Sequence, residues 1–466
     1  MDALPIVIFC LTTFAYLVSL PAGQRRLNLV ALFLLSQTLM FVGTLPLLDP
    51  IFEADRVHLW VMTITQVLFM TGALVARAVD RRDSGGPAAK QWWAGPLLCE
   101  YGREFDAVLL VVAVVSVAAT IIYYVMVGYN VFTMSVESYL KTGSALEDVR
   151  DLRKNMYNGE TYFAPGYFNQ FKNVLLPLVT ALYFVRYGLL RRRSDLWFGL
   201  VLLPIGIVGL LGTGQRGAMA QAFLIAGVFG SATLPQRTRR RVMLPLVAGG
   251  LFLFGVATLF LGRTATRVDS AGSAFAILKE MFDRVFWGNQ FASLWGFRYI
   301  YHASDPGFGS DWLAEICSVL PRPIRPAIES TLNIDIFEVM FHDREGTAPP
   351  SLWGSVWYNF GRFGVVAVPL LLGALYQRIQ MGLFRGPKTL GRLLTYSGAC
   401  VYLGLWGAGG PLVLANTGLL TVLILGFLLR KASAHRVGVS DPASHPRESG
   451  RGEVFPRRQE QGSAAG

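Results

Sequence analysis

The residues best suited to chemistry lie in one polar stretch, residues 262–363, within a chain otherwise made of apolar runs. In this stretch His342 is followed directly by Asp343 and Arg344. A neighbouring carboxylate can keep an imidazole basic, and an adjacent guanidinium can hold an anion close to it. The triplet therefore predicts a general base beside an anionic substrate, with His342, Asp343 and Arg344 as the candidate catalytic residues.

Other groups in the same stretch could supply the base. His302 is its second histidine, and the carboxylates of Glu338 and Glu345 lie close to the triplet in the sequence. Metal chemistry is not expected, because the aspartates are dispersed along the stretch and no His/Glu pair has zinc-protease spacing. We therefore expect neither a metal nor a cofactor.

Arg216 lies in the turn Gly-Thr-Gly-Gln-Arg-Gly at 212–217, between two apolar runs. The glycine spacing matches a dinucleotide-binding turn, but that motif needs a preceding strand and an acidic residue about 20 positions later. A tight turn whose arginine reaches the lipid headgroups is one interpretation. We favour the other, in which Arg216 and the amides of the following helix bind an anion.

Arg263 and Arg267 follow the eighth apolar run and are four residues apart. They would share one face if the helix of that run continues. Contact with lipid phosphates and a clamp on a phosphorylated substrate both fit this spacing, so both interpretations stay open.

The composition indicates a membrane protein. Of 466 residues, 53% are hydrophobic and only 15% are charged, whereas a soluble protein carries about 25% charged residues. The net charge is +12, but the basic residues sit in short clusters between apolar runs. This is the orientation signal of membrane proteins, so nucleic acid is not an expected partner.

Eleven apolar runs have a length that crosses, or nearly crosses, the hydrocarbon core. They predict an all-α polytopic integral membrane protein with a large, partly helical extracytoplasmic loop between the eighth and ninth spans. The predicted spans are 3–20, 28–47, 59–78, 107–127, 173–187, 196–211, 218–234, 242–261, 365–376, 393–406 and 412–429.

Basic clusters fall on every second loop, which places those loops in the cytoplasm. The amino terminus and the loops 128–170 and 262–363 would then lie outside. Residues 1–431 form the predicted transmembrane domain. The tail 432–466, rich in Pro, Gly, Ser and charge, is expected to be cytoplasmic and disordered.

The outer loop 128–170 contains a predicted helix of its own. A capping-box pattern at 144–147 is followed by apolar residues at helical spacing. This pattern predicts an amphipathic helix on the outer leaflet. Its apolar residues are Leu146, Val149, Leu152 and Met156.

Four segments carry a resemblance to a known family. They are the turn around Arg216, Leu-Pro-Arg-Pro-Ile-Arg-Pro at 320–326, Trp-Tyr-Asn-Phe-Gly-Arg-Phe-Gly at 357–364 and the Arg153-bearing helix at 148–159. In this order and topology they resemble the Wzy-type O-antigen polymerases, which join oligosaccharide repeat units in bacteria. The chain departs from the pattern at Ser355, where an acidic residue is expected.

The resemblance implies a membrane glycosyltransferase of the bacterial cytoplasmic (inner) membrane that makes O-antigen, capsule or exopolysaccharide. It would transfer a growing glycan from undecaprenyl pyrophosphate to an incoming lipid-linked repeat unit. Expected partners are that lipid-linked oligosaccharide, membrane lipids, and a chain-length regulator and flippase of the same pathway. The residues expected to bind the pyrophosphate or the glycan are Arg216, Arg263, Arg267, Arg322, Arg153, Tyr358 and Asn359.

Two other functions compete with this one. An O-antigen ligase would use the same donor on the same face with a different acceptor. A lipid-linked oligosaccharide flippase or other transporter would explain the spans, but it would not need the stretch 262–363, and internal symmetry would be expected.

Overall fold

A computed structural model describes residues 3–21, 28–79, 86–142, 146, 148–157, 165–214, 216–234, 236–261, 279, 282–283, 287–302, 306–320, 324–326, 331–344, 346–432 and 435–439. These residues are almost entirely helical, which confirms the predicted all-α class. Six stretches are long and apolar enough to cross a membrane. They are Leu29–Leu47, Glu53–Val79, Arg103–Val127, Gly166–Leu190, Arg193–Leu211 and Leu352–Phe384.

Each of the eleven predicted apolar runs lies, apart from at most two residues at either end, within the extent of one helix or of two consecutive helices. The helices concerned are α1 (Ala3–Ser19), α2 (Leu29–Thr44), α3 (Glu53–Val79), α5 (Arg103–Val127), α9 (Leu176–Leu190), α10 (Arg193–Leu211), α11 (Arg216–Thr233), α12 (Gln236–Leu261), α17 (Leu352–Phe384), α18 (Leu390–Gly404), α19 (Leu412–Thr417) and α20 (Leu419–Ala432). A π-helical segment, η2 (Gln170–Leu175), leads into α9, and a short 3-10 turn, η1 (Leu45–Leu47), follows α2.

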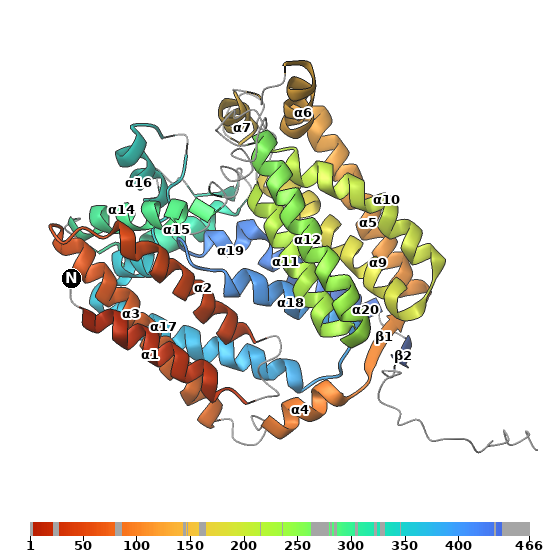
Figure 1. Ribbon diagram of the computed structural model, residues 1–466, viewed down its shortest axis with the longest axis horizontal. Helices are drawn as coiled ribbons and strands as arrows, with labels where there is room; N and C mark the ends of the chain where they lie inside the picture. The colour runs from red at the N-terminus through yellow and green to blue at the C-terminus, as the bar shows by residue number, and fades with distance from the viewer. Residues whose placement is uncertain are drawn as a thin grey trace, which may run out of the picture.

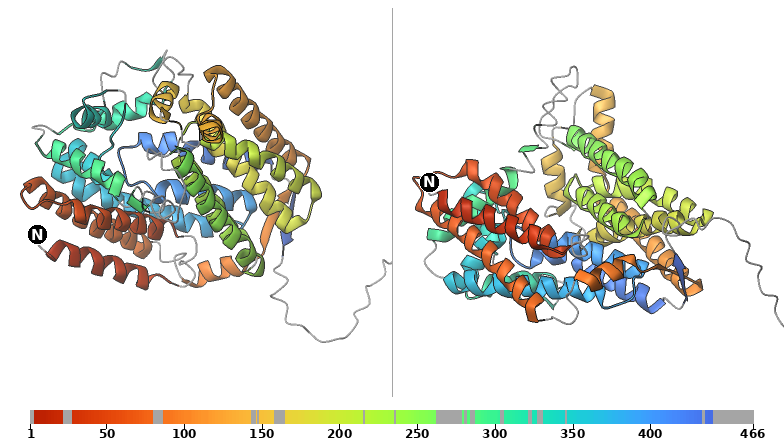
Figure 2. Two further views of the ribbon diagram at one scale, coloured as in Figure 1. Left: turned by 45° about the horizontal axis from the view of Figure 1, so that its top comes forward. Right: turned by 60° about the horizontal axis from the view of Figure 1, so that its bottom comes forward.

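The long helices form two groups. In both views of Figure 2, α1, α2, α3 and α17 lie on one side of the molecule, and α5 and α9 to α12 lie on the other. Helices α18 and α20 join the groups, since α18 packs against α2 and α11, and α20 packs against α5. Helices α3 and α17 pack most closely, because Gly72 faces the backbone of Leu370 and Gly373 faces the carbonyl of Phe69, with no room for a β-carbon at either glycine.

The short elements gather at the two ends of the long helices (Figure 1). One end, called the α7 end below, carries α6 (Val131–Thr142), α7 (Val149–Tyr157), α14 (Asn289–His302), α15 (Ser310–Ser318) and α16 (Leu332–Phe341). Helix α8 (Pro165–Asn169) packs against α5 and η2, and α19 packs against α15. The opposite end carries α4 (Gly86–Ala94), β1 (Leu97–Tyr101) and β2 (His435–Val439). The described helices of the stretches 128–170 and 262–351 therefore lie toward the same end of the molecule.

Two predicted boundaries are corrected. Helix α17 already begins at Leu352, so the last part of the predicted loop 262–363 is helical, with a kink at Gly361 (φ 58°, ψ −149°). The predicted span 412–429 is broken at Gly418, whose φ of 117° favours glycine and ends α19 before α20 begins. Periodic hydrophobicity does not reveal such breaks, because both sides of each are apolar.

The predicted disordered tail is also corrected in part. Residues His435–Val439 form β2, which pairs antiparallel with β1, placing Val437 opposite the buried Cys99. The β-branched valines favour an extended conformation, and β1 supplies the partner that a composition argument cannot see. The rest of the predicted tail, from 440 to 466, lies outside the described residues.

Candidate functional site

Helix α7 brings several of the predicted site residues together. A β-carbon at Gly214 would lie 3.0 Å from Cδ of Arg153, so the arginine stem lies against the glycine turn that precedes Arg216. On the next residue, Lys154 Nζ lies 3.2 Å from Asp343 Oδ2. Helix α7 thus contacts both the turn at Gly214 and the segment of Asp343, which are far apart in the sequence.

The α7 helix is amphipathic as predicted, but its apolar face does not lie on the outer leaflet. Met156 has no exposed surface, and Val149 is buried with it in a hydrophobic cluster that includes Leu211. Tyr129 Oη donates to the carbonyl of Leu152 at 2.8 Å. Apolar side chains of the protein, rather than lipid, therefore cover this face, and Arg153 is exposed. The capping-box residues 144–147 lie outside the described residues.

The triplet 342–344 lies directly after α16. His342 ends that helix with a left-handed backbone (φ 54°), and its side chain is exposed. Asp343 forms the ion pair with Lys154, and Arg344 Nε lies 3.1 Å from Glu338 Oε2 on the exposed surface. Over the part of the chain that the structure describes, the His342 ring makes no hydrogen bond. The imidazole is thus accessible, while its two neighbours anchor the turn.

Several predicted binding residues cannot be placed. Arg263, Arg267 and Arg322, and the alternative base Glu345, lie outside the described residues. Arg216 opens α11, but the position of its side chain is not described.

Tyr358 and Asn359 precede the kink in α17, where the backbone carbonyls lose their helical partners. Gly307 N–H donates to the carbonyl of Tyr358 at 2.8 Å, and Gly309 N–H donates to that of Asn359 at 3.0 Å. The kink therefore fixes the loop before α15 onto α17. Tyr358 remains half-buried, whereas Asn359 has no exposed surface.

The amide of Asn359 is used inside the protein. Its Nδ2 donates to the Ser355 carbonyl at 2.9 Å and lies 3.4 Å from Asp311 Oδ2, while its Oδ1 accepts from the backbone N–H of Trp312 at 3.3 Å. Trp312 Nε1 also donates to Ser355 Oγ at 2.8 Å. Asn359 therefore positions α15 against α17, and the carboxylate nearest to Ser355 in this network comes from α15.

Two buried carboxylates that the sequence argument passed over lie on one face of α15. Asp311 Oδ1 accepts from the backbone N–H of Leu332 at 2.9 Å. Glu315 has no exposed surface; Oε1 accepts from Asn333 Nδ2 at 2.9 Å, and Oε2 accepts from the backbone N–H of Leu412 at 3.0 Å. Asp311 and Glu315 are four residues apart, which is the spacing that could have revealed a shared face.

Burial controls the protonation of these carboxyl groups. It raises the pKa of Glu315 to about 7, outweighing the opposite effect of the amide donors, and it also raises the pKa of Asp311. Glu315 links α15 to the start of α16 and to the start of α19. Because a substrate hydroxyl cannot touch a side chain with no exposed surface, we assign Glu315 a positioning role.

The sequence argument also missed a buried lysine, Lys172, because the predicted span 173–187 begins one residue after it. Lys172 has no exposed surface, and it lies in the π-helical segment η2. Its Nζ donates to Asn173 Oδ1 at 3.2 Å and lies 5.1 Å from the centre of the Tyr123 ring. A lysine within a candidate span was the available signal, since such residues are costly in lipid.

No group of three or more His, Cys, Asp and Glu side chains within the described ranges has the geometry to hold a metal ion. The chain matches no protein-family model, no curated protein and no solved structure. Its function must therefore be argued from its own residues.

Proposed function

We propose that this protein is a membrane glycosyltransferase that polymerises undecaprenyl-pyrophosphate-linked repeat units into O-antigen, capsule or exopolysaccharide. The observation that carries the proposal is the convergence at the α7 end. Arg153, the turn of Arg216 and the His342 segment meet there through α7, above helices that are suited to a membrane. A substrate with a lipid tail and an anionic, hydrophilic head needs both features.

The reaction assigns a separate task to each kind of residue. A hydroxyl of the incoming unit attacks the anomeric carbon of the growing glycan, and its proton passes to a base. A new carbon–oxygen bond forms while the bond between that carbon and the pyrophosphate oxygen breaks. Undecaprenyl pyrophosphate then leaves with the electron pair. Fixed guanidinium groups can stabilise the developing charge without a metal ion.

His342 is our candidate for the base, because its ring is exposed and close to the pair formed by Lys154 and Asp343. Arg216 and Arg153 are the candidates for holding the pyrophosphate, with the amides at the start of α11 as further donors. Tyr358 is half-buried near the same end and offers an aromatic face to a sugar ring. Arg263, Arg267 and Arg322 remain candidates on the sequence argument alone.

The proposal includes a topology. The eleven predicted spans would place the α7 end outside the bacterial inner membrane and β1 and β2 in the cytoplasm. The short helix α19 and the kink in α17 then lie at the outer surface. A flippase or a chain-length regulator of the same pathway would meet the protein in this membrane.

Deleting the gene in its host tests the proposal against its rivals. A polymerase is expected to leave cells whose surface glycan carries single repeat units, and the wild-type gene should restore long chains. Loss of all surface glycan, with full-length polymer retained on the lipid carrier, would instead identify a ligase. Accumulation of lipid-linked units on the cytoplasmic face would identify a flippase.

A further inference from the structure

Exposed aromatic side chains form a stripe along α14. Between residues 290 and 300 the exposed side chains of this helix are Phe291, Trp295 and Tyr299, at 46%, 42% and 37%. They are four residues apart and therefore share one face of the helix. The rings of Phe291 and Trp295 lie 6.1 Å apart. A contiguous exposed face of this kind marks a surface of interaction.

An ion pair fixes α14 at the level where a candidate span begins. Arg298 Nε and Nη2 donate to the two carboxylate oxygens of Asp55, each at 2.7 Å. Asp55 lies in the first turn of α3, whose residues Glu53–Val79 are long and apolar enough to cross a membrane. Because this paired geometry holds both side chains in one orientation, α14 is fastened at the height where α3 would leave the hydrocarbon.

The turn before α3 continues the apolar surface. Ile51 is 85% exposed, and Phe52 is 41% exposed. The guanidinium group of Arg298 lies 4.1 Å from the centre of the Phe52 ring and 5.1 Å from that of the Trp295 ring. One cation thus joins aromatic rings from two segments. The surface called the α14 face below comprises Ile51, Phe52, Phe291, Trp295 and Tyr299.

The polar groups near this face fit the boundary between water and hydrocarbon. Glu53 and Arg56, which follow Phe52 at the start of α3, are exposed. On α14 itself no exposed residue between 290 and 300 carries an amide or a charge. A sugar would need hydrogen-bond partners for its hydroxyl groups along the stripe, whereas tryptophan and tyrosine among apolar side chains are typical of the aromatic belt at a membrane surface. The α14 face therefore favours lipid over glycan.

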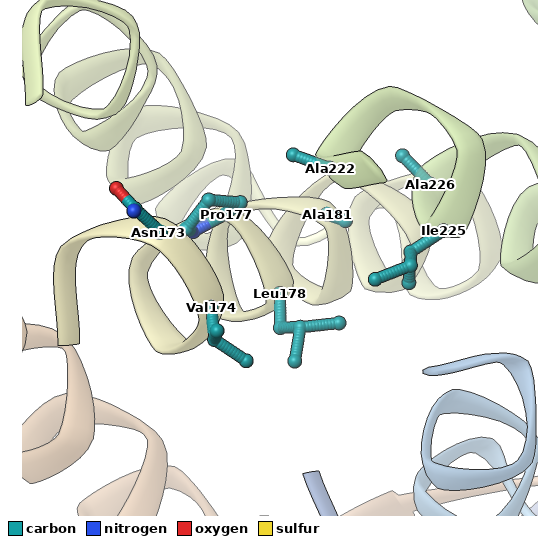
Figure 3. A pocket seen from close by; sticks show the side chains of 8 residues that line it. All are labelled: Asn173, Val174, Pro177, Leu178, Ala181, Ala222, Ile225 and Ala226. Carbon is teal, nitrogen blue, oxygen red and sulfur yellow. The ribbon is translucent and has the colours of Figure 1, made fainter. Parts of the chain in front are cut away.

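A pocket inside the fold offers lipid no comparable contact. Figure 3 shows it between the helix formed by η2 and α9 and the facing helix α11. Its lining is apolar apart from Asn173, but it has room for about one water molecule. An acyl chain does not fit there, so the exposed α14 face is the better site for lipid.

We propose that the α14 face lies in the membrane interface at the α7 end, with its aromatic rings between the phospholipid headgroups and the first methylene groups of the acyl chains. Because the stripe runs along the whole helix, α14 lies along the membrane surface rather than across it. Protein covers its other side, where it packs against α3 and α17. Interfacial helices of this kind reach about 5–10 Å into the boundary between headgroups and acyl chains. Part of the predicted extracytoplasmic loop is thus anchored in the membrane.

The anchored helix also sets the height of the His342 segment. Gly296, on the buried side of α14, faces α16, since a β-carbon there would lie 3.1 Å from Ile336 Cδ1. Helix α16 ends at Phe341, directly before His342. Movement of α14 out of the interface would therefore carry the end of α16 with it.

Nitroxide labels can measure the depth of the α14 face. Phe291→Cys and Trp295→Cys are labelled in separate full-length proteins, after the two cysteines that are not buried, Cys10 and Cys317, are replaced by serine. Each protein is reconstituted into vesicles of phosphatidylethanolamine and phosphatidylglycerol. The ratio of accessibility to oxygen, which dissolves in lipid, over accessibility to a water-soluble nickel chelate should be several times higher than for a Glu338→Cys label. Glu338 is the matched control, because it is a charged, exposed residue on the neighbouring helix α16.

Tryptophan quenching gives a second measurement that needs no introduced cysteine. Phospholipids brominated near the headgroup quench tryptophans that contact the upper acyl chains. Wild-type fluorescence should therefore fall by a larger fraction than that of Trp295→Phe, which keeps an aromatic ring on the stripe but lacks this indole.

Labels at Phe291 and Trp295 that are as accessible to the nickel chelate as the label at Glu338 would overturn the inference. Equal fractional quenching of wild type and Trp295→Phe would do the same. Labels that lie in water and are protected by a soluble oligosaccharide would show a glycan-binding stripe instead, which also overturns it. Since none of these measurements needs substrate or turnover, their outcome is independent of the proposed polymerase activity.

Discussion

Glu315 and Lys172 are both ionisable side chains with no exposed surface, and the segments that carry them, α15 and η2, both pack against the short helix α19. Glu315 accepts from the backbone N–H of Leu412, the first residue of α19. Gln170, two residues before Lys172, donates to the carbonyl of Asn416, near the end of α19. Both oxygens of Glu315 have amide donors, whereas among the described residues Lys172 Nζ has one amide acceptor, Asn173 Oδ1. A buried carboxyl group whose two oxygens both accept hydrogen bonds fits a structural role.

The largest effect is expected from substitution of His342, the candidate base, which lies outside the Glu315 region. His342→Ala should slow polymer formation by roughly 10²- to 10⁴-fold, because a positioned general base contributes about that much. The glycan is sized on gels at matched membrane levels of protein. His302→Ala is the control, since His302 ends α14 and packs on Tyr301, and its polymer should be nearly normal. Normal polymer from His342→Ala, with loss in Glu315→Gln, would move the base to α15.

Substitution of Arg216 tests whether this arginine binds the pyrophosphate of the substrate. Arg216→Ala should slow polymer formation roughly tenfold to a hundredfold by removing a charge-assisted hydrogen bond to the pyrophosphate. Arg216→Lys keeps the charge but loses the fork geometry, so its loss should be smaller. Arg191→Ala is the control, because Arg191 lies at the opposite end of the molecule beside Tyr187. Equal activity of Arg216→Ala and wild type would show that Arg216 only reaches the lipid headgroups.

Glu315→Ala tests whether Glu315 stabilises the fold. The substitution leaves Asn333 Nδ2 and the backbone N–H of Leu412 without their acceptor, which costs about 1–3 kcal/mol for each buried donor. We expect a lower thermal unfolding midpoint in detergent. Glu338→Ala, an exposed carboxylate that pairs with Arg344, should leave the midpoint almost unchanged. An unchanged midpoint in Glu315→Ala would contradict the structural role.

A fourth test concerns pH. Because burial raises the pKa of Glu315 from its ordinary value to about 7, the folded state holds this proton more tightly than the unfolded state. Its contribution to stability is therefore complete below about pH 4.5 and is lost as the pH rises through about 7, by up to about 3 kcal/mol. Glu315→Gln should remove this part of the pH dependence of the unfolding midpoint. Parallel curves for wild type and Glu315→Gln would refute the assignment.

The apolar runs predicted the helices well, because length and hydrophobicity decide whether a segment is helical in lipid. What the runs missed depends on contacts between distant residues. The strand His435–Val439 needs β1 as its partner, and the kink at Gly361 is stabilised by Gly307 and Gly309 from another segment. Neither partner can be identified from local composition.

The candidate site was predicted less completely. The sequence pointed to Arg153, Arg216 and the triplet 342–344 separately, but only the structure shows α7 between them. Lys172 was missed because it stands at the edge of an apolar run, and Glu315 because charged residues in a loop are usually exposed. Lys172 is buried where η2 packs against α5, and Glu315 is buried where α15 packs against α19, which no spacing rule describes.

The most direct measurement of the central claim uses purified protein in detergent, with lipid-linked oligosaccharide extracted from a strain that lacks the gene. The proposed function predicts a ladder of products that differ by one repeat unit, formed without an ion gradient and without added divalent metal, together with stoichiometric release of undecaprenyl pyrophosphate. His342→Ala should give only the starting unit. If the wild-type protein leaves that unit unchanged, and the same protein moves it across a vesicle membrane, the polymerase assignment is contradicted in favour of a transporter.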